Sequence, residues 1–347
     1  MLTRRIAELV CGNWSALGLT GAAPADLRFV KVSASARATK VILFGFPPRG
    51  RFPVVVVKLA PDQEAEERLR AAHRLLGALH RRLPRLAGVP RPLMVERVGS
   101  HLVGVETYLP GQTMYRLYPA QPSWRQRAHV ARDFEAARSW LVRFHQATRS
   151  DRSPTARDLE RCCDAPLEVF ARCHHPTPAE LAALERARGD LADAAGANLP
   201  LVCQQGDYWP RNLLLANDRL AVCDWDWSRP AELPFLDAFL FPLSYSLLLG
   251  AAPPAVGVAF DGLREALLTG SWFARLWRGY TLGYLREMGI DLSLASSFFH
   301  LTLLHMAVRD CAATGQPSRN DALHRELLRR CAEEEVVRRG WLGGLGA

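Results

Sequence analysis

Three polar residues near two apolar segments offer the clearest chemistry in this sequence. Asp207 and Asn212 are separated by four residues, and Asp224 follows the apolar run 220–223. One carboxylate can accept the proton of an attacking hydroxyl, while an amide oxygen and a second carboxylate can hold Mg²⁺ against phosphate groups. The spacing therefore indicates phosphoryl transfer. The structural alternative is an ordinary Asx turn and a strand cap.

At these residues the sequence resembles the aminoglycoside phosphotransferase and choline kinase superfamily, whose fold is kinase-like. The catalytic loop of that superfamily reads approximately His-Gly-Asp, four residues and Asn, and its metal strand ends in Asp-Trp-Glu. Here Gln205 stands in place of the His and Asp226 in place of the Glu. The resemblance implies that Asp207 is the base and that Asn212 and Asp224 are the Mg²⁺ ligands.

Lys58 is a second candidate, because it follows the valine run 54–57 and precedes an acid-rich helix. It resembles the lysine that bridges the α- and β-phosphates in kinase-like folds. The chain has three lysines among its 44 Lys and Arg residues, and an ammonium does not replace a guanidinium freely. The alternative is a solvated charge at a strand edge. The resemblance also implies a glutamate partner on the helix, for which we choose Glu67.

Further nucleotide contacts are implied by the same resemblance. The loop 33–39, including Ser35, would cover the phosphates of ATP or GTP. Backbone groups from Thr107 to Leu109 would meet the adenine edge, and Arg211 is a further nucleotide-binding candidate. His145 and Asp237 are expected to be structural, with Asp237 bracing the catalytic loop.

The elements that must position these residues divide into a β-rich and a helical part. Strands are predicted at 27–32, 40–46, 52–59, 91–98 and 101–109, and a helix at 62–82. Beyond residue 111 the pattern is mainly helical, with short strands at 201–205 and 220–224. The sequence therefore predicts an α+β, two-lobed, protein-kinase-like fold. Residues 1–111 form a small five-stranded nucleotide-binding lobe with one main helix, ending in a hinge. Residues 112–347 form a larger helical lobe with the catalytic loop and the acceptor site.

The charge of the chain is unevenly distributed. The net charge is +9, and residues 1–111 account for all of it, with 17 Lys and Arg against 8 Asp and Glu. A basic first segment suits a phosphate-bearing ligand. No zinc finger or RNP motif is present, so we expect no nucleic-acid partner.

No uncharged apolar stretch is long enough to span a bilayer, and we expect a cytoplasmic protein without a membrane partner. The eight cysteines are expected to be reduced thiols.

The acceptor is the least determined part of the prediction. Residues 262–347 carry 11 Arg against 9 Asp and Glu, so no acidic surplus is available for a polycation. This balance favours a neutral or weakly charged hydroxyl of a small molecule or peptide. An aminoglycoside O-phosphotransferase that confers resistance is the alternative enzyme. A nucleotide-binding pseudokinase or regulatory partner is the alternative of another class, although the complete set of Lys58, Asp207, Asn212 and Asp224 argues against it. The preference between ATP and GTP and the oligomeric state stay open.

Overall fold

The computed structural model describes residues 2–32, 40–116, 118, 122–196, 199–217, 219–249 and 271–333. The chain divides into two compact units. The first comprises Met1–Gln112 and Leu214–Ser228, and the second Thr113–Leu213 and Arg229–Ala347. The segment 214–228, which the sequence-based division assigns to the C-terminal lobe, thus packs with the first unit.

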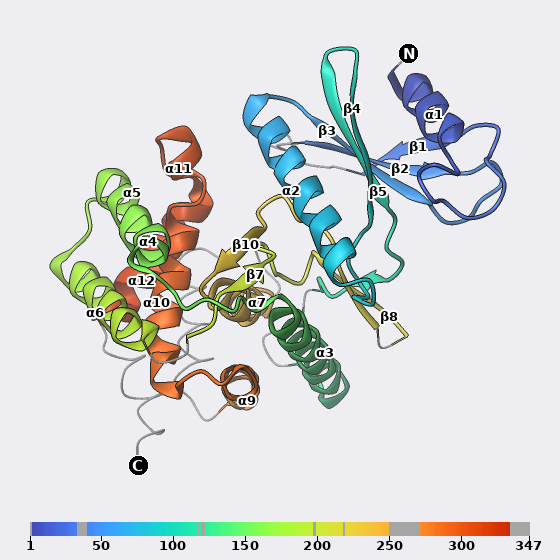
Figure 1. The fold of residues 1–347 in the computed structure, drawn as a ribbon. Coiled ribbons are helices and arrows are strands. Elements are labelled where there is room, and N and C mark those ends of the chain that lie inside the picture. The colour runs from blue at the N-terminus through green and yellow to red at the C-terminus, as the bar shows by residue number, and fades with distance from the viewer. Residues whose placement is uncertain are drawn as a thin grey trace. The chain divides into compact units, whose positions relative to one another are not determined.

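The first unit is built on a five-stranded antiparallel sheet in the order β1-β2-β3-β5-β4, as Figure 1 shows. Its strands are β1 (Arg28–Lys31), β2 (Val41–Phe46), β3 (Val55–Ala60), β4 (Pro92–Val98) and β5 (His101–Thr107). Two helices accompany it, α1 (Leu2–Gly12) and α2 (Gln63–Arg82). The predicted five-stranded lobe with one main helix after the third strand is confirmed.

The two helices of the first unit cover opposite faces of the sheet. Side chains alternate between faces along a strand, and Val57 and Val103 share one apolar cluster with Ile6 of α1. Ala60 and Leu102 form another cluster with Leu69 of α2. Lys58 points to the α2 face, because it lies between Val57 and Leu59, which both belong to the α1 cluster.

The segment that returns to the first unit is fixed there by specific contacts. It contains most of β8 (Leu213–Ala216) and β9 (Arg219–Val222), which form a three-stranded sheet with β6 (Gln112–Thr113). The Val222 N–H donates to the Gly88 carbonyl at 2.7 Å. The Arg68 guanidinium of α2 lies 4.8 Å from the centre of the Trp227 ring. These contacts hold residues 224–226 close to the α2 face of the sheet.

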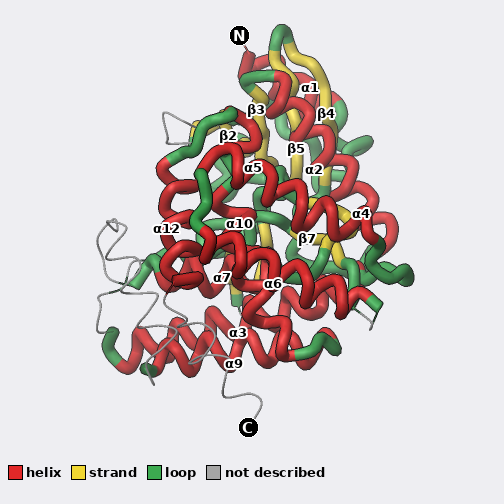
Figure 2. Tube along the Cα trace, turned by 90° about the vertical axis from the view of Figure 1, so that its left-hand side faces the viewer, coloured by secondary structure: helices red, strands yellow, loops and turns green. Residues whose placement is uncertain are grey.

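The second unit is mainly helical. Its helices are α3 (Trp124–Thr148), α4 (Ala156–Leu159), a π-helical turn (Glu160–Asp164), α5 (Ala165–His174), α6 (Pro178–Ala195), α7 (Leu236–Ser246), α9 (Trp272–Met288), a 3₁₀ turn (Leu292–Leu294), α10 (Ala295–Ala307), α11 (Cys311–Thr314) and α12 (Arg319–Glu333). Helices α5, α6, α10 and α12 lie side by side (Figure 2). A second group, α3, α7 and α9, packs around Phe134, whose ring meets those of Phe241, Phe273 and Tyr280 edge-on. In a two-stranded sheet, β7 (Val202–Gln204) pairs with β10 (Arg229–Glu232), and the predicted catalytic loop begins directly after β7.

The cysteines correct one expectation. Cys173 at the end of α5 and Cys311 at the start of α11 form a disulfide, so the prediction of eight reduced thiols is wrong for this pair. The other six cysteines are thiols. Among the described helices, none has both the length and the apolar character that crossing a bilayer requires.

Candidate active site

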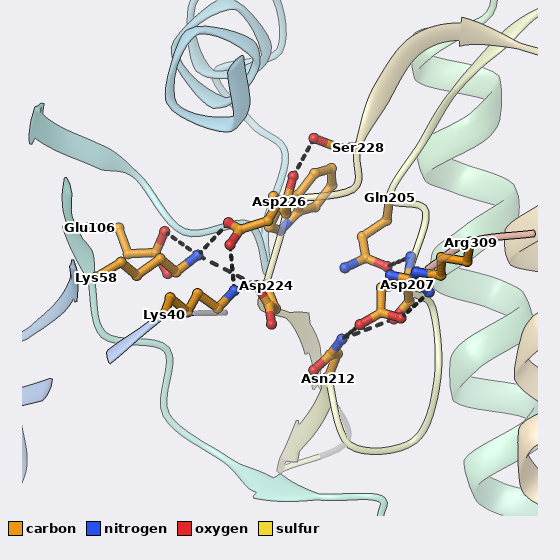
Figure 3. A network of polar contacts seen from close by, with 11 residues as sticks. Lys40, Lys58, Glu106, Gln205, Asp207, Asn212, Asp224, Asp226, Ser228 and Arg309 are labelled. Carbon is orange, nitrogen blue, oxygen red and sulfur yellow. Dashed lines mark hydrogen bonds and ion pairs between the residues drawn. The ribbon is translucent and has the colours of Figure 1, made fainter. Parts of the chain in front are cut away.

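Lys58 is the centre of a charged cluster in the first unit (Figure 3). The β-branched run before it favours a strand, and the side chain is buried at 5% exposure. Its Nζ lies 3.2 Å from Glu106 Oε2, 3.3 Å from Asp226 Oδ1 and 3.8 Å from Asp224 Oδ1. The structure thus brings the predicted phosphate-binding lysine to the predicted metal ligand Asp224.

The prediction of Glu67 as the partner of Lys58 is wrong. Glu67 is exposed on α2 and accepts a hydrogen bond from Gln63 at 3.1 Å. Helix α2 presents Leu69 to the sheet so closely that a Cβ on Gly104 would lie 2.7 Å from Leu69 Cδ1. An apolar side chain therefore fills this part of the space between helix and sheet, and the acid comes from the sheet itself.

Glu106 is the partner that the sequence analysis assigned only to the hinge. In the β3–β5 register Lys58 is opposite Gly104, and Glu106 is two residues further along β5 on the same face. Diagonal neighbours at this separation are within reach of long side chains. The sequence shows only that Glu106 is the single charged residue of the apolar run 102–106. Its position on the same face as Lys58 follows from the strand register.

Lys40 is a second cation that the sequence analysis missed. Lys40 lies directly before β2, and its ammonium contacts both Asp224 and Asp226. With Lys58 and Glu106, the cluster contains two ammonium and three carboxyl groups. If all are ionised, one negative charge is in excess, which suits a divalent cation.

The pKa values in this cluster reflect its composition. Burial by itself lowers the pKa of Lys58, but Asp226 and Glu106 outweigh it and hold the pKa well above its usual value. Burial raises the pKa of Asp226, yet Lys58 and Lys40 bring it below its usual range. Burial raises the pKa of Glu106 in spite of the attraction of Lys58. Lys58 and Asp226 are therefore a firm ion pair at neutral pH.

Asp224 has an unusual backbone conformation and an accessible side chain. It directly follows β9 with φ at 58°, in the left-handed region that side chains other than glycine seldom adopt. Its side chain is 27% exposed, against 13% for Asp226 and 10% for Glu106. Asp224 is thus the most accessible carboxylate of the cluster, and its hard oxygens suit Mg²⁺.

Two of the three predicted hinge residues use their backbone N–H groups for hydrogen bonds within the protein. The Thr107 N–H donates to the Arg91 carbonyl at 3.0 Å, and its hydroxyl accepts from the Arg91 N–H at 2.9 Å. The Tyr108 N–H donates to the Val54 carbonyl at 3.2 Å. Of the predicted positions, Leu109 has no such bond within the described part of the chain. Ser35 and the predicted phosphate loop lie outside the described residues.

The catalytic loop is braced in the second unit by a buried acid. Asp237 is fully buried, and its carboxylate accepts the N–H groups of Gln205 at 2.5 Å and Gly206 at 2.8 Å. Gly206 has φ at 79°, which a glycine adopts without strain. The Gln205 side chain accepts a hydrogen bond from the Asp207 N–H at 2.8 Å. Gln205, which stands in place of the histidine expected from the resemblance, therefore holds the loop.

Asp207 and Asn212 meet within this loop. Asn212 Nδ2 donates to Asp207 Oδ2 at 2.7 Å and to the Asp207 carbonyl at 3.0 Å. The amide nitrogen of Asn212 therefore faces Asp207, and the role of Asn212 as a metal ligand stays a prediction. Asn212 belongs to the second unit and Asp224 to the first.

Two arginine side chains lie at this loop. Arg309 Nη1 donates to Asp207 Oδ1 at 2.7 Å, as Figure 3 shows, and no pattern in the sequence marked this residue. The exposed Arg211 lies over the rings of Tyr115 and Trp209, with its guanidinium 4.5 and 5.1 Å from their centres. The structure thus gives Arg211 an aromatic platform, and its role toward the nucleotide stays a prediction.

His145 is structural, as expected. It is fully buried, its Nδ1 pairs with the Tyr284 hydroxyl at 2.7 Å, and its Nε2 lies 3.7 Å from Asp237. Burial lowers the pKa of this histidine. A neutral ring therefore packs behind the brace of the catalytic loop.

Comparisons with known proteins concern the family and the fold of the chain. The model of the phosphotransferase enzyme family matches residues 47–232. A candidate aminoglycoside phosphotransferase from Ralstonia eutropha JMP134 has a similar structure, with a TM-score of 0.61 at 16% identity over 94% of this chain and 98% of the other. A macrolide 2′-phosphotransferase from Brachybacterium faecium gives 0.51 at 19% identity, over 95% and 97%. At these identities the likeness shows the fold. No curated protein sequence matched the chain.

Proposed function

Because the chain belongs to the phosphotransferase enzyme family, we propose that it moves the γ-phosphoryl group of ATP or GTP to a hydroxyl, with Asp207 as the base. The observation that carries the proposal is the construction of the loop around Asp207. Its backbone is braced by the buried Asp237, and its two carboxylate oxygens are held by Arg309 and Asn212. A fixed carboxylate beside a metal-type amide is what positioning catalysis needs.

The nucleotide would bind through the first unit. Lys58 would meet the α- and β-phosphates as a buried ammonium held in place by Glu106. Leu109 would offer its backbone groups to the adenine edge, and Arg211 of the second unit remains a candidate contact. Removing Lys58 should therefore reduce both nucleotide affinity and rate.

The residues present fit Mg²⁺. Asp224 is accessible and lies in a cluster rich in carboxyl groups, while Asn212 turns an amide oxygen away from Asp207. We propose these two residues as the protein ligands. Mg²⁺, when bound, would neutralise charge on the phosphates.

The chemical step would need little else from the protein. Asp207 would accept the proton of the acceptor hydroxyl as the acceptor oxygen forms its bond to the γ-phosphorus. The bond from that phosphorus to the bridging oxygen would break, and the nucleoside diphosphate would leave with the electron pair. General-base assistance of this kind contributes about 10²- to 10⁴-fold in rate.

We infer that the acceptor is neutral or weakly charged. Structures with a similar fold include kinases named for aminoglycosides, macrolides and amicoumacin, so the fold leaves the acceptor open. In this chain a guanidinium already contacts the base. A polycationic acceptor would therefore have to approach an occupied carboxylate with like charge beside it.

The test is a screen of acceptors with γ-labelled ATP, in which sugars, macrolides, hydroxyl-bearing peptides and kanamycin are compared. We expect label on a neutral acceptor, poor transfer to kanamycin, and little kanamycin resistance on expression. The Asp207→Asn variant is the control and should transfer almost nothing. Preferred phosphorylation of kanamycin would overturn the acceptor class, and full activity of the variant would overturn the catalytic loop.

A further inference from the structure

Arg309 is placed in the turn between α10 and α11, far along the chain from the catalytic loop. Its Nη1 lies 2.7 Å from Asp207 Oδ1, and the two side chains are largely buried, at 13% and 20% exposure. Hydrogen bonds between two ionised groups are shorter and stronger than neutral ones. Partial burial also reduces the screening of this pair by salt. The contact is therefore a strong constraint on the Asp207 side chain.

The constraint is complementary to that of Asn212. Asn212 Nδ2 holds Asp207 Oδ2 at 2.7 Å, and Arg309 holds Oδ1. With both donors the carboxylate plane is fixed, whereas with Asn212 alone the group could turn about its bond to Cβ. Misplacing a reacting group by about 1 Å can cost about 100-fold in rate.

The turn that carries Arg309 is itself anchored from two sides. The fully buried Asp321 of α12 accepts the N–H of Asp310 at 3.2 Å and that of Cys311 at 2.8 Å. On the other side, Cys311 is joined to Cys173 of α5 by the disulfide. The backbone next to Arg309 is thus fixed to two helices, which gives the guanidinium a defined starting point.

Arg309 and the anchoring residues Cys311 and Asp321 lie outside the part of the chain that the family model matches, residues 47–232, whereas Cys173 lies inside it. The family match therefore says nothing about Arg309, Cys311 and Asp321. The contact with Asp207 is a finding from this structure.

We infer that Arg309 is a positioning residue, which holds Asp207 in the orientation for proton transfer and is itself held by Asp321 and the disulfide. The inference rests on the proposed role of Asp207 as the base. It assigns to the C-terminal helices a part in the reaction besides any contact with the acceptor.

The test compares Arg309→Ala and Arg309→Lys with the wild type and with Arg319→Ala, a change at an exposed arginine of α12. For Arg309→Ala we expect kcat to fall about 10- to 100-fold, while nucleotide KM stays within about twofold. Arg309→Lys should recover part of the loss, since it restores the charge without the planar fork. Added guanidinium ion should raise the rate of Arg309→Ala and leave Arg319→Ala unchanged.

A double variant separates this inference from the proposed function. In the Asp207→Asn background, Arg309→Ala should cost less than about twofold, because residues that act through one group are not additive. If Asp207→Asn is fully active, the proposed base is wrong. If Asp207→Asn is inactive but Arg309→Ala has a kcat equal to or above that of the wild type, only the positioning role is wrong.

A folding defect would be recognised separately. If Arg309→Ala fails to fold, Asp321→Asn, which weakens the anchor of the turn, is measured with Arg309→Lys. A lower kcat at unchanged nucleotide KM in both variants supports the inference. A loss of thermal stability without any change in kcat in these two variants would overturn it.

Discussion

Around Lys58, five charged side chains from four segments of the first unit contact one another directly. Around Asp207, the buried Asp237 accepts backbone N–H groups of the loop, and Arg309 contacts the Asp207 carboxylate. The first arrangement provides charge for phosphate and metal, and the second provides geometry for one carboxylate. Changes in the cluster around Lys58 should therefore alter nucleotide binding and stability, and changes at Asp207 should mainly alter rate.

The largest effect is expected at Asp207. Asp207→Asn should lower kcat by about 10²- to 10⁴-fold, because an amide cannot accept the hydroxyl proton. Nucleotide affinity should change little, since the acid acts on the acceptor side. Steady-state rates and calorimetric nucleotide titration give both values, with the exposed Asp193→Asn as control. If Asp207→Asn lowered nucleotide affinity as much as kcat, Asp207 would act on nucleotide binding, like the Lys58 cluster, and the contrast between these two groups of residues would be wrong.

Lys58→Met should combine two effects. It should weaken nucleotide binding, and it should leave Glu106 and Asp226 buried with less compensation, at a cost of about 3 kcal/mol in unfolding free energy. Chemical denaturation measures this cost, with the exposed Lys31→Met as the matched control. A variant as stable as the control would show that the cluster is not held by this ammonium.

Part of this architecture could be predicted from the sequence. The order of strands and the helix after Lys58 are local patterns, and the loop with Asp207 and Asn212 is a contiguous motif. Residues that meet through the fold were missed. Glu106 reaches Lys58 only through the register of β3 and β5, and Lys40 reaches Asp224 across 184 residues.

Arg309 shows the same limit most clearly. It is one of many arginines, it is separated from Asp207 by 102 residues, and its place depends on how α10, α11 and α12 pack. The disulfide depends on the same packing, because Cys173 and Cys311 are 138 residues apart. The choice of Glu67 failed for the related reason that the helix presents Leu69 instead.

The disulfide should make the stability of the second unit sensitive to a cysteine substitution, since both of its cysteines belong to that unit. Cys173→Ser should lower the unfolding free energy by about 3 kcal/mol, and Cys11→Ser in the first unit should have little effect. Denatured protein without reductant should titrate six thiols, which are the cysteines outside the disulfide, and reduced protein should titrate all eight. Eight thiols before reduction would contradict the bond.

The smallest effect concerns acid sensitivity. Burial lowers the pKa of His305 and His324 in the second unit to about 4, against 6.5 for an exposed ring. The unfolded state thus binds these protons first, so stability is complete above pH 6.5 and falls as the pH decreases toward 4. At pH 5.5 the loss should be about 1 kcal/mol for each histidine.

This acid sensitivity can be measured by thermal unfolding at pH 7.5 and 5.5. The double variant His305→Gln, His324→Gln should lose less stability between these values than the wild type. His101→Gln, at an exposed position of the first unit, is the control. If the double variant lost as much stability as the wild type between these pH values, His305 and His324 would not be the cause of the acid sensitivity.

The proposed phosphoryl transfer depends on a metal ion, and calorimetric titration of ATP with Mg²⁺ or with EDTA tests this dependence most directly. We expect tight binding only with the metal. Asp224→Asn, in the first unit, and Asn212→Ala, in the second, should each weaken the binding by about tenfold, or about 1.4 kcal/mol. ATP binding of equal affinity in EDTA, or unaffected by either change, would contradict the account.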